Sequence, residues 1–335
     1  MALLEVLESG LYCPAGNFHI DPALPVDRAL ITHAHSDHAR PGSRTYLTAL
    51  PGVSLLRARI GDEAPIQAEA YGASIRIGDV CVSFHPAGHI LGSSQIRIER
   101  GGEVWVVSGD YKLAADPTCS PFEPLRCHTF VTESTFGLPI FRWGDAARTV
   151  AEIQHWWISN RQAGRASILF AYPVGKAQRI LSLLDAGAGP LVFHEPVERV
   201  NALYRAQGIA LPLHAETQDF SEALILAAPG AQGSAWLRRF GPASTAFASG
   251  WMRIRGPRRR LSLDRGFVLS DHADWPELLQ AIEQTGADTV WVTHGHIGPM
   301  VRWLEERGKQ AVAVELALPA NGEQPSSTEP EALPE

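Results

Sequence analysis

The stretch "ALITHAHSDHARPG" (residues 29–42) begins with apolar residues. Three histidines and one aspartate then occur within six positions: His33, His35, Asp37 and His38. Alternate side chains of an extended segment share a face, so His33 and His35 can hold one ion together. Asp37 and His38 follow at the turn, where they can hold a second ion. Imidazole and carboxylate ligands together favour Zn²⁺ or Mn²⁺ over copper. A solvated polar loop is the alternative, but this density of ligands favours a metal site.

Further candidate ligands follow three other predicted strands. His89 lies in "FHPAGHILGSSQ", Asp110 ends the run "EVWVVSGD", and His294 ends "VWVTH". A carboxylate at such a strand end can bridge two ions. An isolated histidine such as His85 or His296 is more often structural, so the shared position after strands distinguishes the three candidates.

The apolar periodicity predicts an α/β chain, in which a strand-rich first part precedes alternating strands and helices. The clearest helix is predicted at residues 145–164, with Asp145 as its N-cap. Alternation between residues 190 and 242 predicts a parallel sheet, and residues 265–296 read as strand, loop, helix and strand. The early strands are predicted at residues 28–34, 74–87, 94–100 and 103–110.

Composition limits the class of protein. A chain of 335 residues with 45% hydrophobic content can bury a core as one large domain or two smaller ones. The four cysteines have no CxxC spacing, which argues against a disulfide framework and a thiolate zinc site. The beginning of the chain lacks a signal-peptide pattern, and no apolar run reaches the roughly 20 residues that span a bilayer. We therefore expect a cytoplasmic protein without membrane association.

Net charge is −7, and residues 321–335 contribute four glutamates and no base. We expect this Pro-, Glu- and Ser-rich segment to be a disordered acidic tail. Global charge speaks only weakly against a polyanionic partner, because a local basic patch can still bind one.

The motifs HAHSDH, AGHILGS, SGDYK and THGH together resemble those of the metallo-β-lactamase superfamily, over about residues 12–300. The resemblance implies that His33, His35 and His89 hold one metal, that Asp37, His38 and His294 hold a second, and that Asp110 lies between them. It also implies that Asp21 in "FHIDP" supports the ligands by hydrogen bonds, with Asp27 a weaker candidate for this role.

Two further motifs, "VTESTFG" and "LSDHADW", resemble those of the β-CASP nuclease branch of this superfamily. They imply that His272 faces the scissile phosphate and that Glu133 orients His272. Asp37 and Asp110 complete the implied catalytic set. The implied reaction is phosphodiester hydrolysis by hydroxide activated between two ions, Zn²⁺ or Mn²⁺ and, as a further option, Fe²⁺.

The resemblance also implies a fold and its divisions. The expected fold is a metallo-β-lactamase αββα sandwich with an inserted α/β β-CASP cap domain. Its first part would be residues 1–144, its cap 145–257, its return segment 258–320 and the tail 321–335.

Within the expected cap, two turns carry residues that suit a phosphate or a nucleic-acid backbone. An ordinary strand-to-helix turn and a solvated face of bases are the alternatives. The candidates are Gly175, Lys176, Ser249, Gly250, Trp251, Arg253 and Arg255.

The opening "LYCPAGNFHIDP" and the compact insert resemble the bacterial ligase-associated DNA exonucleases. The lysine of "VGKAQ" resembles DNA-type members, whereas His294 resembles RNA-type members. The expected function is a single-strand DNA exonuclease in DNA repair, with DNA-repair proteins such as an ATP-dependent DNA ligase as implied partners. The alternatives are an RNA-processing nuclease, a small-molecule thioester or lactam hydrolase, and a non-catalytic nucleic-acid-binding subunit.

Overall fold

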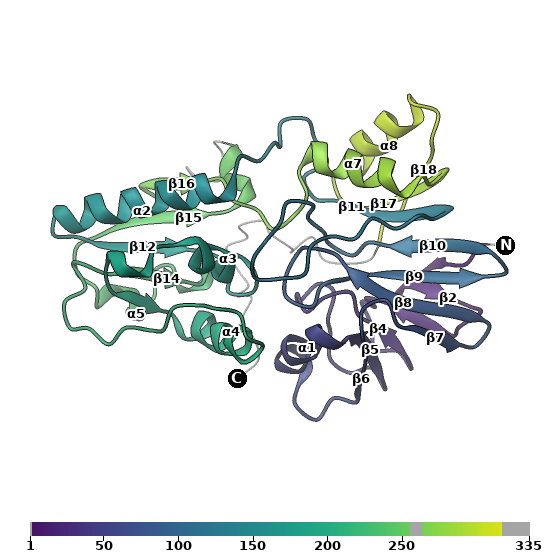
Figure 1. Ribbon diagram of the computed structural model, residues 1–335, viewed down its shortest axis with the longest axis horizontal. Helices are drawn as coiled ribbons and strands as arrows, with labels where there is room; N and C mark the ends of the chain where they lie inside the picture. The colour runs from purple at the N-terminus through teal and green to yellow at the C-terminus, as the bar shows by residue number, and fades with distance from the viewer. Residues whose placement is uncertain (1, 255–262, 317–335) are drawn as a thin grey trace. The chain divides into compact units, whose positions relative to one another are not determined.

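The computed structural model describes residues 2–254 and 263–316, which form two compact units (Figure 1). The first unit comprises residues 2–142 and 271–316, and the second comprises residues 143–254 and 263–270. Arg255 and the expected acidic tail at 321–335 lie outside the described residues. Within the described residues, no helix is both long enough and apolar enough to cross a membrane.

Two mixed sheets build the first unit. The six-stranded sheet has the order β1-β2-β3-β4-β5-β6, antiparallel from β1 to β3 and parallel from β3 to β6. Its strands are β1 (Glu5–Leu7), β2 (Gly10–Cys13), β3 (Phe18–Ile20), β4 (Ala29–Leu30), β5 (Tyr46–Ala49) and β6 (Ile66–Glu69).

The seven-stranded sheet has the order β18-β17-β11-β10-β9-β8-β7. Its strands are antiparallel from β7 to β10 and parallel from β10 to β18. They are β7 (Ser74–Ile77), β8 (Val80–Pro86), β9 (Ser94–Arg100), β10 (Glu103–Val107), β11 (Thr129–Ser134), β17 (Thr289–Gly295) and β18 (Gln310–Ala313).

Apolar side chains join the two sheets and cover their outer faces. Leu11, Phe18 and Leu30 of the first sheet share a buried cluster with Val82 and Ile98 of the second. On the far side of the second sheet lie α7 (Trp275–Thr285) and α8 (Ile297–Glu305), and α1 (Val53–Ile60) covers the first sheet (Figure 1). The layers are therefore helix, sheet, sheet and helix.

The second unit contains a five-stranded sheet with the order β13-β14-β12-β15-β16, in which every pair is parallel. The strands are β12 (Ala166–Phe170), β13 (Leu191–Phe193), β14 (Leu224–Ala227), β15 (Ala243–Ala248) and β16 (Arg265–Phe267). The helices are α2 (Ala146–Gln162), α3 (Lys176–Leu183), α4 (Glu195–Ala206) and α5 (Ala235–Arg238). Short 3₁₀ helices occur in this unit at Ala186–Ala188, Pro229–Ala231 and Gly250–Arg253, and in the first unit at Leu50–Gly52.

Local structure agrees with the sequence in most places. The predicted helix is α2, and the side chain of Asp145 accepts a hydrogen bond from the Ala147 amide as its N-cap. The parallel sheet predicted between residues 190 and 242 is present. The predicted strand at 28–34 is wrong in extent, because β4 comprises only Ala29 and Leu30.

The four cysteines differ in accessibility, which predicts their reactivity. Cys81 is exposed, whereas Cys13 and Cys127 are buried. Burial raises the pKa of the Cys127 thiol to about 12 and also raises that of Cys13. Because the thiolate is the nucleophile, iodoacetamide should label Cys81 well before the other two at pH 8. Peptide mass spectrometry measures this order, urea-unfolded protein is the control, and rapid labelling of Cys127 in the folded protein would contradict it.

Candidate metal centre

The loop after β4 brings the histidines together by a turn rather than by strand alternation. Ile31 still pairs with the neighbouring strand, its amide donating to the Leu47 carbonyl at 2.9 Å. A turn then forms where the amides of His38 and Ala39 both donate to the His35 carbonyl, at 3.1 and 2.8 Å. The alternating geometry expected for His33 and His35 is therefore wrong, although their rings lie 4.8 Å apart between centroids.

Three imidazole nitrogens and one carboxylate oxygen converge in the first unit. His35 Nδ1 lies 3.1 Å from His33 Nε2 and 3.0 Å from His89 Nε2. Asp110 Oδ2 lies 3.4 Å from His33 Nε2 and 3.9 Å from His89 Nε2. Nitrogens bound to one tetrahedral zinc ion are about 3.3 Å apart, given bonds of about 2.0–2.1 Å. These four buried side chains could therefore bind one metal ion.

His38, Asp37 and His294 surround the other side of Asp110. His38 Nε2 lies 3.4 Å from Asp110 Oδ2 and 3.9 Å from Asp37 Oδ2, and the His294 ring is 5.3 Å from that of His38. Among the described residues, the ligand atoms of His33, His35, His89 and Asp110 all lie within 4.8 Å of one another. His38, Asp37 and His294 do not belong to that set. The second group is therefore less tightly gathered.

Buried polar atoms in the second group lack hydrogen-bond partners in the described part of the chain. They are Asp37 Oδ1, His38 Nε2 and His294 Nε2. Leaving such an atom unpaired costs about 1–3 kcal/mol. A divalent cation would satisfy all three, so the donor set fits a second ion.

Hydrogen bonds from Nδ1 orient the imidazoles of His89 and His38. His89 Nδ1 lies 3.0 Å from the Asp271 carbonyl, which only accepts, so Nδ1 carries the proton. His38 Nδ1 donates in the same way to Asp21 Oδ2 at 2.8 Å. In the neutral rings, Nε2 then holds the lone pair that a metal needs.

Threonines orient two more of the five candidate imidazoles. The Thr32 hydroxyl donates to Asp21 Oδ2, so it accepts from His33 Nδ1 at 3.1 Å. The Thr293 hydroxyl donates to the Thr132 carbonyl at 3.2 Å, so it accepts from His294 Nδ1 at 2.9 Å. Sequence reasoning missed both threonines, although each directly precedes a candidate ligand in the dipeptide Thr-His.

Asp21 anchors this arrangement. Its Oδ1 accepts from the Thr32 amide at 2.8 Å, and its Oδ2 accepts from Thr32 and His38. Its backbone is left-handed, with φ 45°, an unfavourable conformation for a residue with a side chain. Asp27, the weaker candidate, is exposed.

A β-bulge positions His294. Strands β11 and β17 pair in register up to Glu133 and Thr293, after which Ser134 pairs with Gly295. His294 is the extra residue, and its backbone is left-handed, with φ 50°. Its direction is therefore set by the bulge and not by the alternation of the strand.

Glu133 and His272 form a buried pair beside Asp110. Glu133 Oε2 lies 2.8 Å from His272 Nδ1, and its Oε1 accepts from the Tyr111 amide at 2.8 Å. His272 Nδ1 is 4.0 Å from Asp110 Oδ2. Burial raises the pKa of Glu133. The predicted partners Glu133 and His272 therefore lie together, next to the cluster of candidate ligands.

The pKa shifts of His33, His89 and Asp110 suit metal binding, whereas that of His38 opposes it. Burial lowers the pKa of His33 to about 4 and that of His89 well below its usual value. Burial opposes ionisation of Asp110, but His38 and His272 outweigh it and hold its pKa well below the usual range. His38 behaves oppositely, since Asp110 and Asp37 raise its pKa despite burial. At neutral pH, His33 and His89 are thus uncharged and Asp110 is ionised, as metal ligands must be.

A lysine that the sequence analysis missed holds the His272 segment. The buried Lys112 donates to the His272 carbonyl and contacts Glu277 Oε2, each at 3.3 Å. Glu277 also accepts from the Ala114 amide at 2.7 Å. The only sequence signal was a lysine two residues after a candidate ligand.

The candidate phosphate-binding residues lie in the second unit, where β12 and β15 are parallel neighbours. Gly175 and Ser249 therefore follow strands that end at the same sheet edge. The Gly175 amide donates to Gln178 Oε1 at 2.8 Å, and Ser249 Oγ accepts from the Trp251 amide at 3.3 Å. Lys176 is buried with its Nζ 4.7 Å from the Tyr172 ring centre. Gly250 and Trp251 are buried, Arg253 is exposed, and Arg255 lies outside the described residues.

Comparisons with known proteins place these features in context. No protein-family profile matches the chain. It is 30% identical over 310 residues to a protein named as a probable DNA ligase from Opitutus terrae, covering 91% of this chain and 30% of that protein. It is 28% identical over 199 residues to Ribonuclease TTHA0252 from Thermus thermophilus, covering 50% of this chain and 44% of that protein. The chain thus spans less than half the length of these relatives.

Among solved structures, the fold resembles that of a protein of unknown function from Enterococcus faecalis. The TM-score is 0.57 at 14% identity, covering 88% of this chain and 80% of the other. This likeness supports an α/β fold.

The hydrogen bonds of Asp21 predict that it tunes metal affinity. Asp21→Asn replaces one acceptor oxygen by a donor, which disrupts the bonds that orient His38 and Thr32. Loss of such a bond costs about 10–100-fold in metal affinity. Competition with a chromophoric chelator measures the effect on Zn²⁺ binding, and Asp27→Asn, at an exposed position, is the matched control. Equal affinity in the two variants would remove Asp21 from the site.

The backbone at Gly88 packs closely against the segment that carries Asp110, so a side chain at Gly88 should disturb the candidate metal ligands. Its φ is +75°, and a Cβ there would lie 2.2 Å from the Lys112 carbonyl oxygen. Gly88→Ala should therefore separate the segments that carry His89 and Asp110. We expect weaker Zn²⁺ binding and a loss of about 1–3 kcal/mol of unfolding free energy beyond backbone strain.

The control for this variant is Gly72→Ala, which has the same φ of +75° but open space around the added Cβ. It should show only the cost of a left-handed alanine, about 1–2 kcal/mol. Urea unfolding and the chelator titration compare the two variants. Equal losses in both would show that the approach of Gly88 to Lys112 is unimportant.

Proposed function

We propose that the protein is a metal-dependent nuclease of the metallo-β-lactamase superfamily and its β-CASP branch. One observation carries the proposal: two buried clusters share Asp110, one made with His33, His35 and His89 and the other with Glu133 and His272. The first suits a metal ion, and the second suits proton transfer beside it. The names of the relatives, a probable DNA ligase and a ribonuclease, support a substrate that is a nucleic acid.

The architecture agrees with this proposal. Helix, sheet, sheet and helix are the layers of an αββα sandwich, and the second unit, inserted between residues 142 and 271, would be the β-CASP cap. The proposed cap therefore extends to residue 270 rather than to the expected 257, since β16 pairs with β15 in the sheet of the second unit.

We propose two sets of metal ligands, one on each side of Asp110. His33, His35 and His89 would hold one, and Asp37, His38 and His294 the other, with Asp21 supporting His38. Zn²⁺ and Mn²⁺ fit these imidazole and carboxylate donors, as does Fe²⁺. Two such ions, when bound, activate water and neutralise phosphate charge.

His272 and Glu133 would act on the leaving group. Glu133 Oε2 accepts a hydrogen bond from His272 Nδ1 at 2.8 Å. The opposite nitrogen, Nε2, would then bind a phosphate oxygen or deliver a proton to the leaving oxygen. The carboxylate of Glu133 also stabilises the imidazolium form, as a nearby negative charge does. This pair distinguishes the proposal from hydrolysis of a thioester or lactam.

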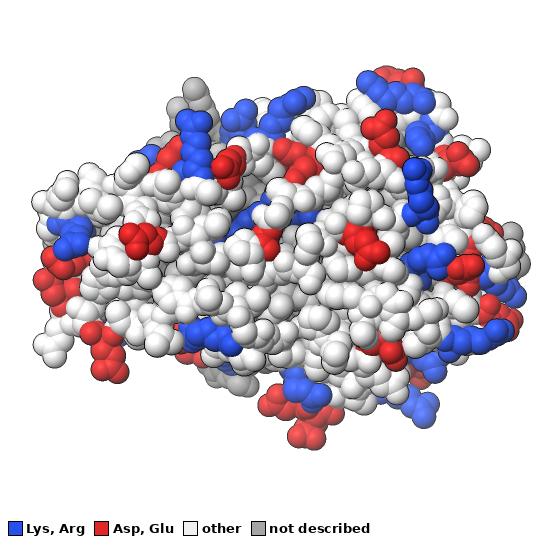
Figure 2. Space-filling view, viewed as in Figure 1, with Lys and Arg blue, Asp and Glu red and all other residues white. Residues whose placement is uncertain are grey.

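Within this class we favour exonuclease action on single-stranded DNA in DNA repair. Similarity to the probable DNA ligase extends over 91% of the chain and suggests an ATP-dependent DNA ligase as a partner. Similarity to the ribonuclease, over 50% of the chain, favours RNA processing as the second candidate. Acidic and basic side chains are interspersed on the viewed face of the described residues (Figure 2).

The pairing of His272 with Glu133 generates a prediction for turnover. His272→Ala should lower nuclease kcat by about 10²–10⁴-fold, because it removes a proton donor, while the bound metal stays unchanged. Single-turnover cleavage and elemental analysis measure the two quantities. His85→Ala removes a histidine outside the site and should leave both intact. Loss of metal from His272→Ala would contradict the assignment and make His272 a ligand.

The substrate is tested on matched single-stranded DNA and RNA, each labelled at the 5′ end or the 3′ end, with Mn²⁺ or Zn²⁺. We expect mononucleotides from one end of DNA only, with His35→Ala inactive. Internal RNA fragments would establish the RNA alternative. No cleavage of either strand, together with thioester or lactam hydrolysis, would replace the nuclease proposal.

A further inference from the structure

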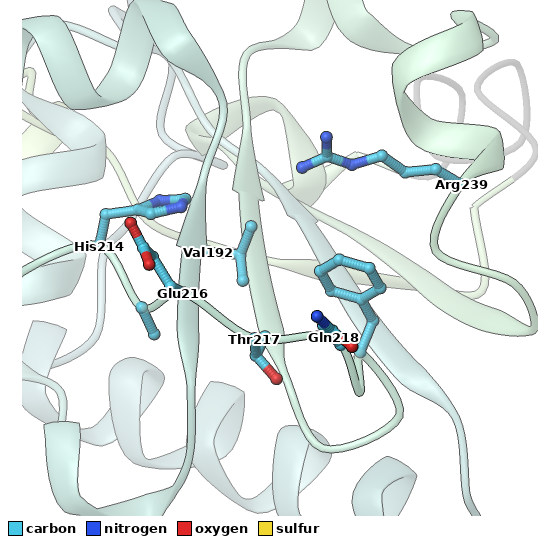
Figure 3. Close-up of a pocket in the computed structure, with 8 residues that line it drawn as sticks. Val192, His214, Glu216, Thr217, Gln218 and Arg239 are labelled. Carbon is cyan, nitrogen blue, oxygen red and sulfur yellow. The ribbon is translucent and has the colours of Figure 1, made fainter.

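A cavity of about 600 Å³ lies in the second unit, beside the edge strand β13 (Figure 3). Its volume falls in the range of small-molecule sites. Because all its lining residues belong to one unit, the cavity is independent of the metal cluster. The residues that determine its chemistry are Val192, His214, Glu216, Gln218, Phe220 and Arg239.

Arg239 gives the cavity a cation that is held in place by aromatic rings. Its guanidinium carbon lies 4.8 Å from the ring centre of Phe240, 5.2 Å from that of Trp236 and 5.7 Å from that of Phe220. The side chain is exposed, and within the described residues its guanidinium makes no hydrogen bond or ion pair. The rings therefore restrain the guanidinium while its N–H donors stay available for an anion.

The opposite wall carries a donor and an acceptor. His214 Nδ1 accepts from the Phe193 amide at 3.0 Å, so the proton of the neutral ring is on Nε2. Glu216 is exposed, and its carboxylate makes no ion pair in the part of the chain that is described. Figure 3 shows Arg239 on one side and His214 with Glu216 on the other, with Val192 between them.

We propose that this cavity binds one nucleotide unit. Its phosphate would pair with the guanidinium of Arg239, since a bidentate charge-assisted bond is the strongest contact the cavity offers. The base would lie against the Phe220 ring and present its amino group to Glu216, as carboxylates accept from base amino groups. Inorganic phosphate would leave the apolar wall and the carboxylate unused. An apolar ligand would leave Arg239 and Glu216 unpaired.

A free nucleotide and one residue of a strand share this chemistry. Both are tested on the full chain carrying His35→Ala with a chelator present, so that cleavage does not consume the probe. The probes are deoxyadenosine monophosphate, deoxyribose 5-phosphate, and a fluorescent deoxyadenosine oligonucleotide. Calorimetry measures the first two and anisotropy the third. Cleavage by the unsubstituted chain is assayed separately, so failure here is distinct from failure of the nuclease proposal.

We expect Arg239→Gln to weaken deoxyadenosine monophosphate binding by about tenfold or more, as loss of a charge-assisted bond does. The matched control is Arg238→Gln, next in the chain, where the guanidinium donates to the Gly233 carbonyl at 3.0 Å and lies outside the cavity. This control should bind as the parent does. Deoxyribose 5-phosphate should bind more weakly than the nucleotide, because it lacks the base.

A parallel loss of oligonucleotide affinity in Arg239→Gln would identify a strand as the source of the nucleotide. Loss confined to the mononucleotide would identify a free nucleotide. Equal binding by the Arg239 and Arg238 variants would overturn the proposal, as would the absence of binding of both the mononucleotide and the oligonucleotide at about 1 mM. Circular dichroism verifies that both variants fold.

Discussion

The buried carboxylate of Asp110 is the charge around which the first unit is organised. An ionised carboxylate is stable away from water only when positive charge or hydrogen-bond donors surround it. Here His38 and His272 approach Asp110 to 3.4 and 4.0 Å and lower its pKa, and Asp110 in turn raises the pKa of His38. Segments distant in sequence are therefore held at one end of the sheets by an electrostatic requirement as well as by apolar packing.

A layer of hydrogen bonds outside the rings makes this arrangement specific. Carbonyl, carboxylate and hydroxyl acceptors bind the Nδ1 protons of four histidines and direct the opposite nitrogens inward. Acceptor identity decides the tautomer, so the chemistry of the centre depends on residues such as Thr32 and Thr293 that would touch no ion. Glu133 does the same for His272 and links it to the backbone at Tyr111.

The sequence predicted much of the fold, because apolar periodicity and end signals are local properties. The helix capped by Asp145 and the strand at 94–100 are examples, as is the parallel sheet of the second unit. The early end of β4 was missed, because the apolar run continues past Leu30. Density of histidines indicated which residues would gather, and the structure brings His33, His35, His89 and Asp110 together. Their roles as ligands remain a proposal.

The features that the sequence did not predict depend on contacts between residues far apart in the chain. The bond from Lys112 to the His272 carbonyl joins residues 160 positions apart, and no local pattern encodes it. The cavity at Arg239 was likewise not predicted, because it joins Arg239, Trp236 and Phe240 to the separate segment at residues 214–220.

The bulge in β17 separates the residues that build the core from the residue that faces the candidate ligands. Val290 and Val292 obey the alternation that builds the core, whereas His294 follows the extra residue that breaks it. A shift of one residue at this point would turn the imidazole away without moving either valine. The direction of His294 can therefore change in one small step while the core built by the valines stays intact.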